Sequence, residues 1–373
     1  MIALLALLLT PQNLTPAACS QGAALVIHKD GKPARIVQSF ECDTTRDKAR
    51  LIAWTLHDGT RVWNTAADAQ TLSFGRKLHG LGDLDADGWQ DLAVISLDAS
   101  SQERVVALRD GARGETMRVM RCEPDERDFA GSVLPIRDRD GDGVADWVAS
   151  VCVQDPTQRA QYAALIVYSG KSGERLGRLI SSQRANSLQG FAVSDGARWV
   201  WLLAGRSVQA FDLDSGVVAK SWQSEDAAVP VRLVRAASGA LALIESPPSG
   251  GLRLRELGAT SLKSERTLEL AGVRPVQDLV QVVDRNADGV EDWLALHNGS
   301  AEGLGTWLSG KDWSVLGQLR PDGIATHFQT REVHRIEGQG FLITNHNTRP
   351  QEKERGAYWF SADGALRRVF AGS

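Results

Sequence analysis

A nine-residue, aspartate-rich pattern occurs three times in the chain and constrains its fold more than any other feature. The copies are Asp83–Asp91 (DLDADGWQD), Asp138–Asp146 (DRDGDGVAD) and Asp284–Asp292 (DRNADGVED). Side chains with oxygen atoms occupy positions 1, 3, 5 and 9 of each copy, and glycine occupies position 6. Oxygen side chains at alternate positions of a tight loop can converge on one hard cation, and the glycine allows the sharp turn. The pattern therefore predicts about three Ca²⁺ sites.

The predicted ligands are the oxygen side chains at positions 1, 3, 5 and 9 and the backbone carbonyl at position 7. They are Asp83, Asp85, Asp87, Trp89 and Asp91; Asp138, Asp140, Asp142, Val144 and Asp146; and Asp284, Asn286, Asp288, Val290 and Asp292. Without a cation, the carboxylates of one loop would repel one another. We therefore expect a structural metal; the alternative is three acidic surface turns that bind no metal.

The residues around the loops exclude the EF-hand, which needs a bidentate Glu at position 12 and a helix on each side. Position 12 is Val94, Ala149 or Ala295, and short apolar runs of β type follow position 9. The loops are therefore expected at the tips of β-hairpins.

A repeat of roughly fifty residues organises the chain around these loops. The clearest unit, 74–120, contains an apolar strand, the Asp loop and three further strands, and the same order recurs in 129–180 and 276–320. Four units keep the strands but lack the Asp loop, namely 23–65, 189–223, 229–271 and 329–371. This period predicts an all-β fold, a seven-bladed β-propeller with four-stranded antiparallel blades, rather than a sandwich or a β-helix.

The strands that follow the loops are apolar on both faces, as expected for blades that stack against a neighbour on each side. In this register the chain begins with a first strand and ends with a fourth, so no terminal strand completes a shared blade. Closure of the ring is then expected to depend on packing between the first and last blades.

Residues 1–18 have the pattern of a signal peptide, with a short apolar run from Ile2 to Leu9 and small residues at Ala17 and Ala18. We expect export to the periplasm, the extracellular space or the cell surface, with 19–373 as a single propeller domain. Cys19 directly after Ala18 leaves a lipoprotein as the alternative. No other stretch is apolar and long enough to be a transmembrane segment.

The four cysteines, in a chain expected to be exported, favour disulfides. The pairs closest in sequence are Cys19 with Cys42 and Cys122 with Cys152, and we predict both bonds.

Little in the sequence indicates catalysis or nucleic-acid binding. The net charge is −4 and no basic stripe is present, so nucleic acid is not expected as a partner. There is no G-x-S-x-G or HExxH motif, and Gly170-Lys171-Ser172 lacks the upstream glycine of a phosphate-binding loop. His79 and His297 lie near Asp loops, where a base or a hydrogen-bonded strand-end histidine would both fit. We assign no catalytic residue and no other cofactor.

Several segments resemble the FG-GAP repeat of integrin α-subunit propellers and their bacterial secreted versions. These segments are Phe74-Gly75, Gly82–Gly88, Asp91–Val94 and the turn Val167–Glu174. The resemblance implies a seven-bladed propeller with Ca²⁺ in first-hairpin loops, and ligand binding or adhesion more often than catalysis. The expected function is thus an exported, calcium-stabilised module that binds a protein or a glycan; the alternative is an exported enzyme that acts on polysaccharide in the axial cleft.

Overall fold

β-Strands make up all the regular secondary structure that the computed structural model describes, and no α-helix occurs in the described residues. The described residues are 19–42, 49–67, 71–155, 160–184, 188–193, 198–224, 228–236, 239–247, 252–258, 261–270, 276–300, 303–320, 330–336, 339–345 and 357–370. The predicted signal peptide, 1–18, lies outside them. No helix in this part of the chain is long and apolar enough to cross a membrane.

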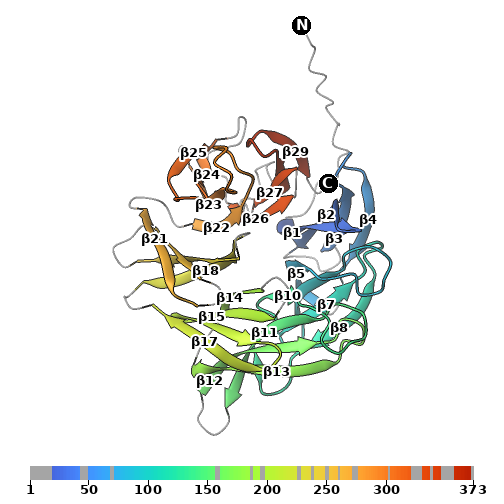
Figure 1. Ribbon diagram of the computed structural model, residues 1–373. Coiled ribbons are helices and arrows are strands. Elements are labelled where there is room, and N and C mark those ends of the chain that lie inside the picture. Colours follow the sequence, from blue (N-terminus) through green and yellow to red (C-terminus); the bar gives the residue numbers. More distant parts are fainter. Residues whose placement is uncertain are drawn as a thin grey trace.

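The strands form seven antiparallel sheets arranged around one axis, which confirms the predicted propeller (Figure 1). Blade 1 contains β1 (Cys19–Lys29), β2 (Lys32–Cys42), β3 (Arg50–Thr55) and β4 (Arg61–Ala66). Blade 2 contains β5 (Thr71–Gly80), β6 (Leu92–Asp98), β7 (Arg104–Arg109) and β8 (Thr116–Arg121). Blade 3 contains β9 (Glu126–Arg127), β10 (Val133–Pro135), β11 (Trp147–Asp155), β12 (Ala160–Tyr168) and β13 (Arg175–Arg184).

The remaining four blades follow the same order from the axis outwards. Blade 4 contains β14 (Leu188–Val193), β15 (Trp199–Ala204), β16 (Ser207–Asp212) and β17 (Val217–Gln223). Blade 5 contains β18 (Val229–Arg235), β19 (Leu241–Ser246), β20 (Leu252–Leu257) and β21 (Ser264–Leu270). Blade 6 contains β22 (Val276–Gln281), β23 (Trp293–Ser300), β24 (Gly303–Leu308) and β25 (Val315–Leu319). Blade 7 contains β26 (Thr330–Ile336), β27 (Gly340–Asn345), β28 (Ala357–Phe360) and β29 (Leu366–Phe370).

Blade 3 departs from the predicted four strands because two short strands share its inner position. Both β9 and β10 pair with β11, at Cys152–Val153 and at Trp147–Ala149 respectively. The connection from the outer strand of blade 2 therefore reaches the sheet of blade 3 at two separate points.

Buried apolar side chains lie between each pair of neighbouring blades, so each of the seven interfaces has its own cluster. In β6 and β16 nearly every side chain is buried, because both faces of an inner strand pack against another blade. The outer strands β8 and β17 instead carry only exposed and half-buried side chains. The apolar pattern on both strand faces thus predicted the blade packing correctly.

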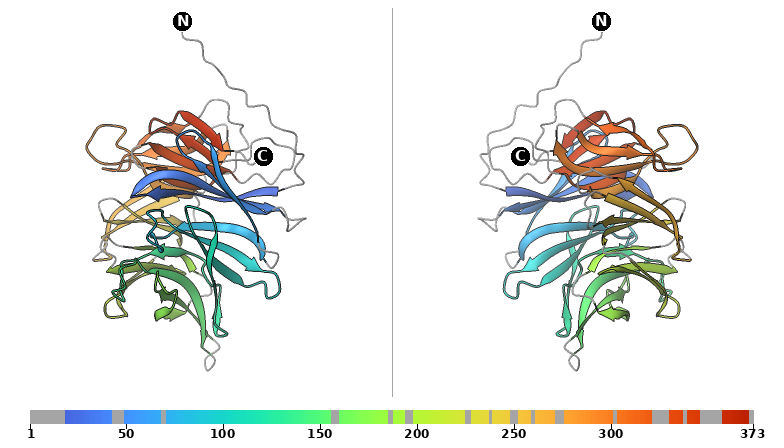
Figure 2. Two further views of the ribbon diagram at one scale, coloured as in Figure 1. Left: turned by 90° about the vertical axis from the view of Figure 1, so that its right-hand side faces the viewer. Right: turned by 90° about the vertical axis from the view of Figure 1, so that its left-hand side faces the viewer.

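The ring closes by packing between blades 1 and 7, as the strand register predicted. Ile36 and Trp54 of blade 1 lie in one buried cluster with Leu342 and Phe370 of blade 7, and the rings of Trp54 and Phe370 are 6.2 Å apart. Figure 2 shows these two blades, blue and red, side by side at the point of closure. Each blade takes its strands from one continuous stretch of chain, so within the described residues no hydrogen-bonded strand is shared across this junction.

Candidate metal centres

The three Asp loops each join an inner strand of a blade to the next strand outwards. They connect β5 to β6, β10 to β11 and β22 to β23. Because each loop precedes the second strand of an equivalent sheet, all three lie on one face of the ring. The expected placement at the tips of first hairpins is therefore correct.

Within each loop the carboxylate at position 1 organises a tight turn. Asp83, Asp138 and Asp284 accept the backbone N–H of the position-6 glycine at 2.8 Å, 2.9 Å and 2.8 Å respectively. These glycines have φ values of +87°, +86° and +86°, a backbone conformation that side chains with a Cβ rarely adopt. The position-5 carboxylates accept the N–H of position 7, for example Trp89 N to Asp87 Oδ1 at 2.9 Å.

The carboxylate at position 9 is buried and binds backbone on both of its oxygens. Asp91 accepts the N–H of Leu84 at 2.7 Å and that of Gly111 at 2.9 Å. The equivalent bonds link Asp146 to Arg139 and Gly170, and Asp292 to Arg285 and Gly310. A carboxylate has about four lone-pair sites, so these bonds leave acceptor capacity for a cation. Position 9 thus ties the Asp loop to the turn between the third and fourth strands of its own blade.

The turn between the third and fourth strands lies so close to the Asp loop that it needs a glycine at the point of contact in all three blades. A Cβ at Gly111, Gly170 or Gly310 would lie 2.1 Å, 2.0 Å or 1.9 Å from the carbonyl oxygen of loop position 8. No side chain fits at such distances. The turn sequences Asp110-Gly111, Ser169-Gly170 and Ser309-Gly310 therefore belong to the candidate site, although their sequence alone indicates only a hairpin turn.

Oxygen atoms converge in the loops from several directions. Ligand atoms of Asp83, Asp85 and Asp91 lie within 4.8 Å of one another, as do those of Asp138, Asp140 and Asp146. The turn adds a further oxygen beside position 5: Asp110 groups with Asp85 and Asp87 in the first loop. The Ser169 and Ser309 hydroxyls donate to Asp142 and Asp288 at 3.2 Å and 3.5 Å. A donor set made only of oxygen atoms fits a hard cation such as Ca²⁺.

The carboxylates experience burial and mutual repulsion. Burial raises the pKa of Asp91 to about 7, against the two N–H bonds that lower it. Burial also raises the pKa of Asp85, with the neighbouring charge of Asp87 as the next cause. The pKa of Asp146 is raised by burial too, whereas the N–H of Gly143 lowers that of Asp138. A bound cation would favour the ionised form of all four carboxylates.

The first loop is joined to blade 1 as well as to its own blade. The N–H of Asp30 donates to the Gly88 carbonyl and the N–H of Gln90 donates to the His28 carbonyl, each at 2.9 Å. The Arg35 guanidinium carbon lies 3.6 Å from the centroid of the Trp89 ring. The tip of the first hairpin of blade 1 therefore packs against this loop.

Donors of the preceding blade bind the turn carbonyls at all three loops. Trp63 Nε1 and Arg35 donate to the Gly111 carbonyl at 3.2 Å and 3.0 Å. Arg118 of blade 2 donates to the carbonyls of Gly170 and Lys171, and Arg266 of blade 5 donates to those of Gly310 and Lys311. The turn thus connects each Asp loop to the neighbouring blade.

The two histidines singled out in the sequence are separated from each other in the ring. His297 is buried within β23, with Nε2 3.0 Å from the Thr306 hydroxyl. His79 is half-buried in β5, next to Gly80 at the end of the strand.

The predicted Cys122–Cys152 disulfide is wrong, because both are free cysteines in the structure. Cys122 packs against a cluster that contains Val151 and Val153 of β11. Cys152 lies between these valines, and successive side chains of a strand point to opposite faces. The Cys122 thiol instead donates to Glu103 Oε2 at 3.1 Å. For the other pair, the backbone register of β1 and β2 places Cys19 directly opposite Cys42.

Comparison with known proteins supports the fold and leaves the family open. No family model matches the sequence, and no curated protein matches it. Among solved structures, the chain is similar to one described as "Crystal Structure of Mitotic Checkpoint Complex", with a TM-score of 0.55 and 14% identity over 92% of this chain and 95% of the other. A likeness at this identity shows the propeller fold alone.

Proposed function

We propose that this chain is an exported, calcium-stabilised propeller of the FG-GAP type that binds a protein or a glycan. The observation that carries the proposal is the convergence of carboxylate oxygens in the loops Asp83–Asp91 and Asp138–Asp146. All three loops also bind a turn of their own blade whose carbonyls accept from the preceding blade. Propellers present broad loop faces without requiring any reactive group, and function depends on the site rather than on the fold.

In this proposal calcium would have a structural role and would cross-link the oxygen ligands of each loop. The residues that would hold it are the side chains at positions 1, 3, 5 and 9 and the carbonyl at position 7 of each loop. A cation there would neutralise the crowded carboxylates and hold the loop against its turn, and the turn would hold the preceding blade. The metal would then stabilise blade contacts at blades 2, 3 and 6 and would take no part in a reaction.

The test is binding by the mature chain with calcium and with chelator. We expect a glycan array or a pull-down with surface proteins to show a ligand, and we expect its binding to weaken when chelation loosens the loop face. The Asp87→Ala, Asp142→Ala and Asp288→Ala variants should weaken binding in the same direction. Equal melting temperatures with calcium and after complete metal removal would contradict the calcium part. Turnover of a polysaccharide would instead favour the alternative function, an exported enzyme that acts on polysaccharide.

A further inference from the structure

A cavity between blades 2 and 3 has the chemistry of a binding site that the Asp loops do not explain. Its volume is about 510 Å³, within the range of small-molecule sites. The residues that line it come from β5, β6 and β7, from the β6–β7 turn, from the chain between β8 and β10, and from β12. The β6–β7 turn lies at the end of blade 2 opposite the Asp loop, so the cavity opens on the other face of the ring.

We propose that this cavity binds one or two neutral sugar units of a glycan. The proposal rests on the proposed binding function and names where, and by which chemistry, a glycan would be recognised.

Two of the three arginines in the cavity wall are paired with its two carboxylates, and the third arginine is Arg76. Arg104 Nη1 lies 3.1 Å from the Asp128 carbonyl and 3.5 Å from its carboxylate Oδ1, and Arg127 lies 3.7 Å from Glu103. A charged ligand would have to compete with these ion pairs. A ligand with hydroxyl groups can instead add hydrogen bonds to atoms that the pairs leave available.

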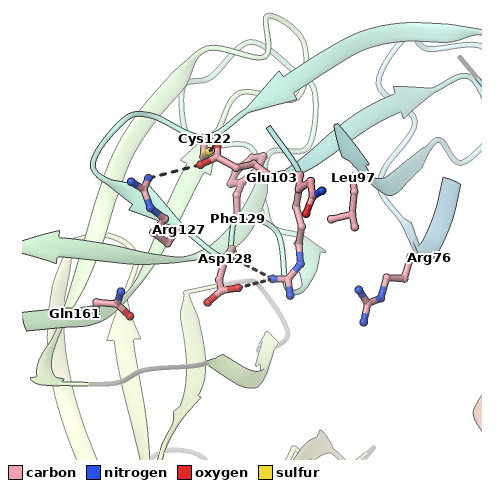
Figure 3. Close-up of a pocket in the computed structure, with 10 residues that line it drawn as sticks. Arg76, Leu97, Glu103, Cys122, Arg127, Asp128, Phe129 and Gln161 are labelled. Atoms are coloured by element: carbon pink, nitrogen blue, oxygen red, sulfur yellow. Dashed lines mark hydrogen bonds and ion pairs between the residues drawn. The ribbon is translucent and has the colours of Figure 1, made fainter. Parts of the chain in front are cut away.

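Amide and carboxylate atoms of the wall remain available for such bonds. Within the described part of the chain, the side chains of Gln102 and Gln161 have no hydrogen-bond partner, and both amides line the cavity. Asp128 keeps Oδ2 outside its ion pair with Arg104. In Figure 3, Asp128 lies between Gln161 on one side and Arg76 on the other. Each amide offers a donor and an acceptor, which matches a hydroxyl group that both donates and accepts.

The backbone of the wall is held in an unusual conformation at two of these residues. Gln102 and Asp128 have φ values of +57° and +54°. Residues other than glycine adopt this region at a cost in free energy, and such positions gather at ligand sites. Leu97, which is half-buried, adds an apolar surface on which the C–H face of a sugar ring could pack.

A second hollow, of about 660 Å³, lies between blades 5 and 6 and includes Glu265 and Lys311. It borders the third Asp loop, and Arg266 in its wall already binds Glu256 and two turn carbonyls. It therefore serves as the comparison site in the experiment.

The experiment measures binding of cellobiose, maltose, lactose and chitobiose, and of galacturonic acid as an anionic probe, by calorimetry and by saturation-transfer NMR. We expect at least one neutral disaccharide to bind the unmodified chain. Gln161→Ala and Asp128→Asn should each weaken that binding by up to about tenfold, the upper end of what one hydrogen bond contributes. Asparagine tolerates the positive φ of position 128, so this variant should fold.

The matched controls are Gln223→Ala, which removes an exposed amide on β17, and Lys311→Ala in the other hollow. Both should bind as the unmodified chain does. The inference is overturned if no neutral disaccharide binds, if only galacturonic acid binds, or if binding is lost in Lys311→Ala and kept in Gln161→Ala. If the chain captures a protein or a longer glycan and Gln161→Ala does not change that binding, the cavity is not the binding site, but the proposed binding function stands. If the unmodified chain binds no sugar, glycan or protein, both the cavity proposal and the proposed binding function are contradicted.

Discussion

Asp91 in the first Asp loop and Gly111 in the β7–β8 turn are joined by a hydrogen bond of 2.9 Å from the glycine N–H to the buried carboxylate. The same bond recurs between Asp146 and Gly170 and between Asp292 and Gly310. The position-9 carboxylate therefore has two roles in this fold. It can bind a cation, and even when no cation is bound it holds the Asp loop against the turn between the third and fourth strands of the blade.

Calcium should raise the melting temperature of the unmodified chain. A ligand that binds only the folded state adds RT ln(1 + [L]/Kd), about 1.4 kcal/mol per site at ten times Kd and about 4 kcal/mol for three independent sites. Asp87→Ala, Asp142→Ala and Asp288→Ala should each remove about one site. Calorimetric melting with calcium and with chelator measures both effects. Variants that keep the full calcium response would speak against the assigned ligands.

Asp91→Asn should destabilise the chain with or without calcium. The amide nitrogen of asparagine cannot accept from the N–H of Leu84 or Gly111, and leaving one buried donor unpaired costs about 1–3 kcal/mol. Asp87→Asn lies in the same loop and should lower the free energy of unfolding mainly when calcium is present. Urea unfolding of both variants in chelator compares the two. Equal stability of the two variants in chelator would show that position 9 has no role without the metal.

Arg118→Met should weaken the contact between blades 2 and 3. The substitution removes the bonds to the carbonyls of Gly170 and Lys171, and hydrogen bonds to charged groups contribute about 1.5–3 kcal/mol. Methionine keeps much of the apolar stem in place. Arg61 is exposed on β4 and Arg61→Met is the matched control. Hydrogen exchange should rise at β11 and β12 in Arg118→Met alone, and an equal rise in both variants would refute the specific contact.

Glu126 should make stability depend on pH in the acid range. The carboxylate is buried, which by itself raises its pKa, but bonds from Arg175 at 2.7 Å and 2.9 Å lower it below the ordinary value. Its contribution is therefore fully present above the unfolded pKa of about 4.3 and is lost as the pH falls through the lower folded value.

The variant Glu126→Gln should thus be less stable than the unmodified chain by about 3 kcal/mol at neutral pH, and the difference should shrink below about pH 4. Urea unfolding across this range measures it, with exposed Glu174→Gln as the control. A difference that grew on acidification would have the wrong sign for this ion pair.

Cysteine mapping should find one disulfide and two thiols in protein produced in an oxidising compartment. The register places Cys19 opposite Cys42, so we expect that bond. Burial raises the pKa of Cys122 and of Cys152 to about 11, so both should stay protonated and react slowly with alkylating agents at neutral pH until the chain unfolds. Four free thiols, or a Cys42–Cys122 bond, would be the contrary result by peptide mass mapping.

The sequence alone determined the features that depend on short stretches of chain. The three Asp loops, the apolar strands after them and the period of the units predicted seven blades, the position of each loop at a hairpin tip and a ring without a shared blade. Ligand spacing and strand alternation are local properties, because a turn and a strand face are set by residues a few positions apart.

Only the tertiary structure decided which distant residues complete each site. The turn residues Gly111, Gly170 and Gly310 follow their position-9 aspartates by 20, 24 and 18 residues, and the two meet only when the outer hairpin folds back along the sheet. Strand alternation within the folded sheet likewise turns Cys152 away from the cluster on which Cys122 packs. The cavity between blades 2 and 3 exists only because the chain from Cys122 to Phe129 crosses from one blade to the next. Contacts of this kind depend on how whole strands pair and stack, which the spacing of residues along the chain does not specify.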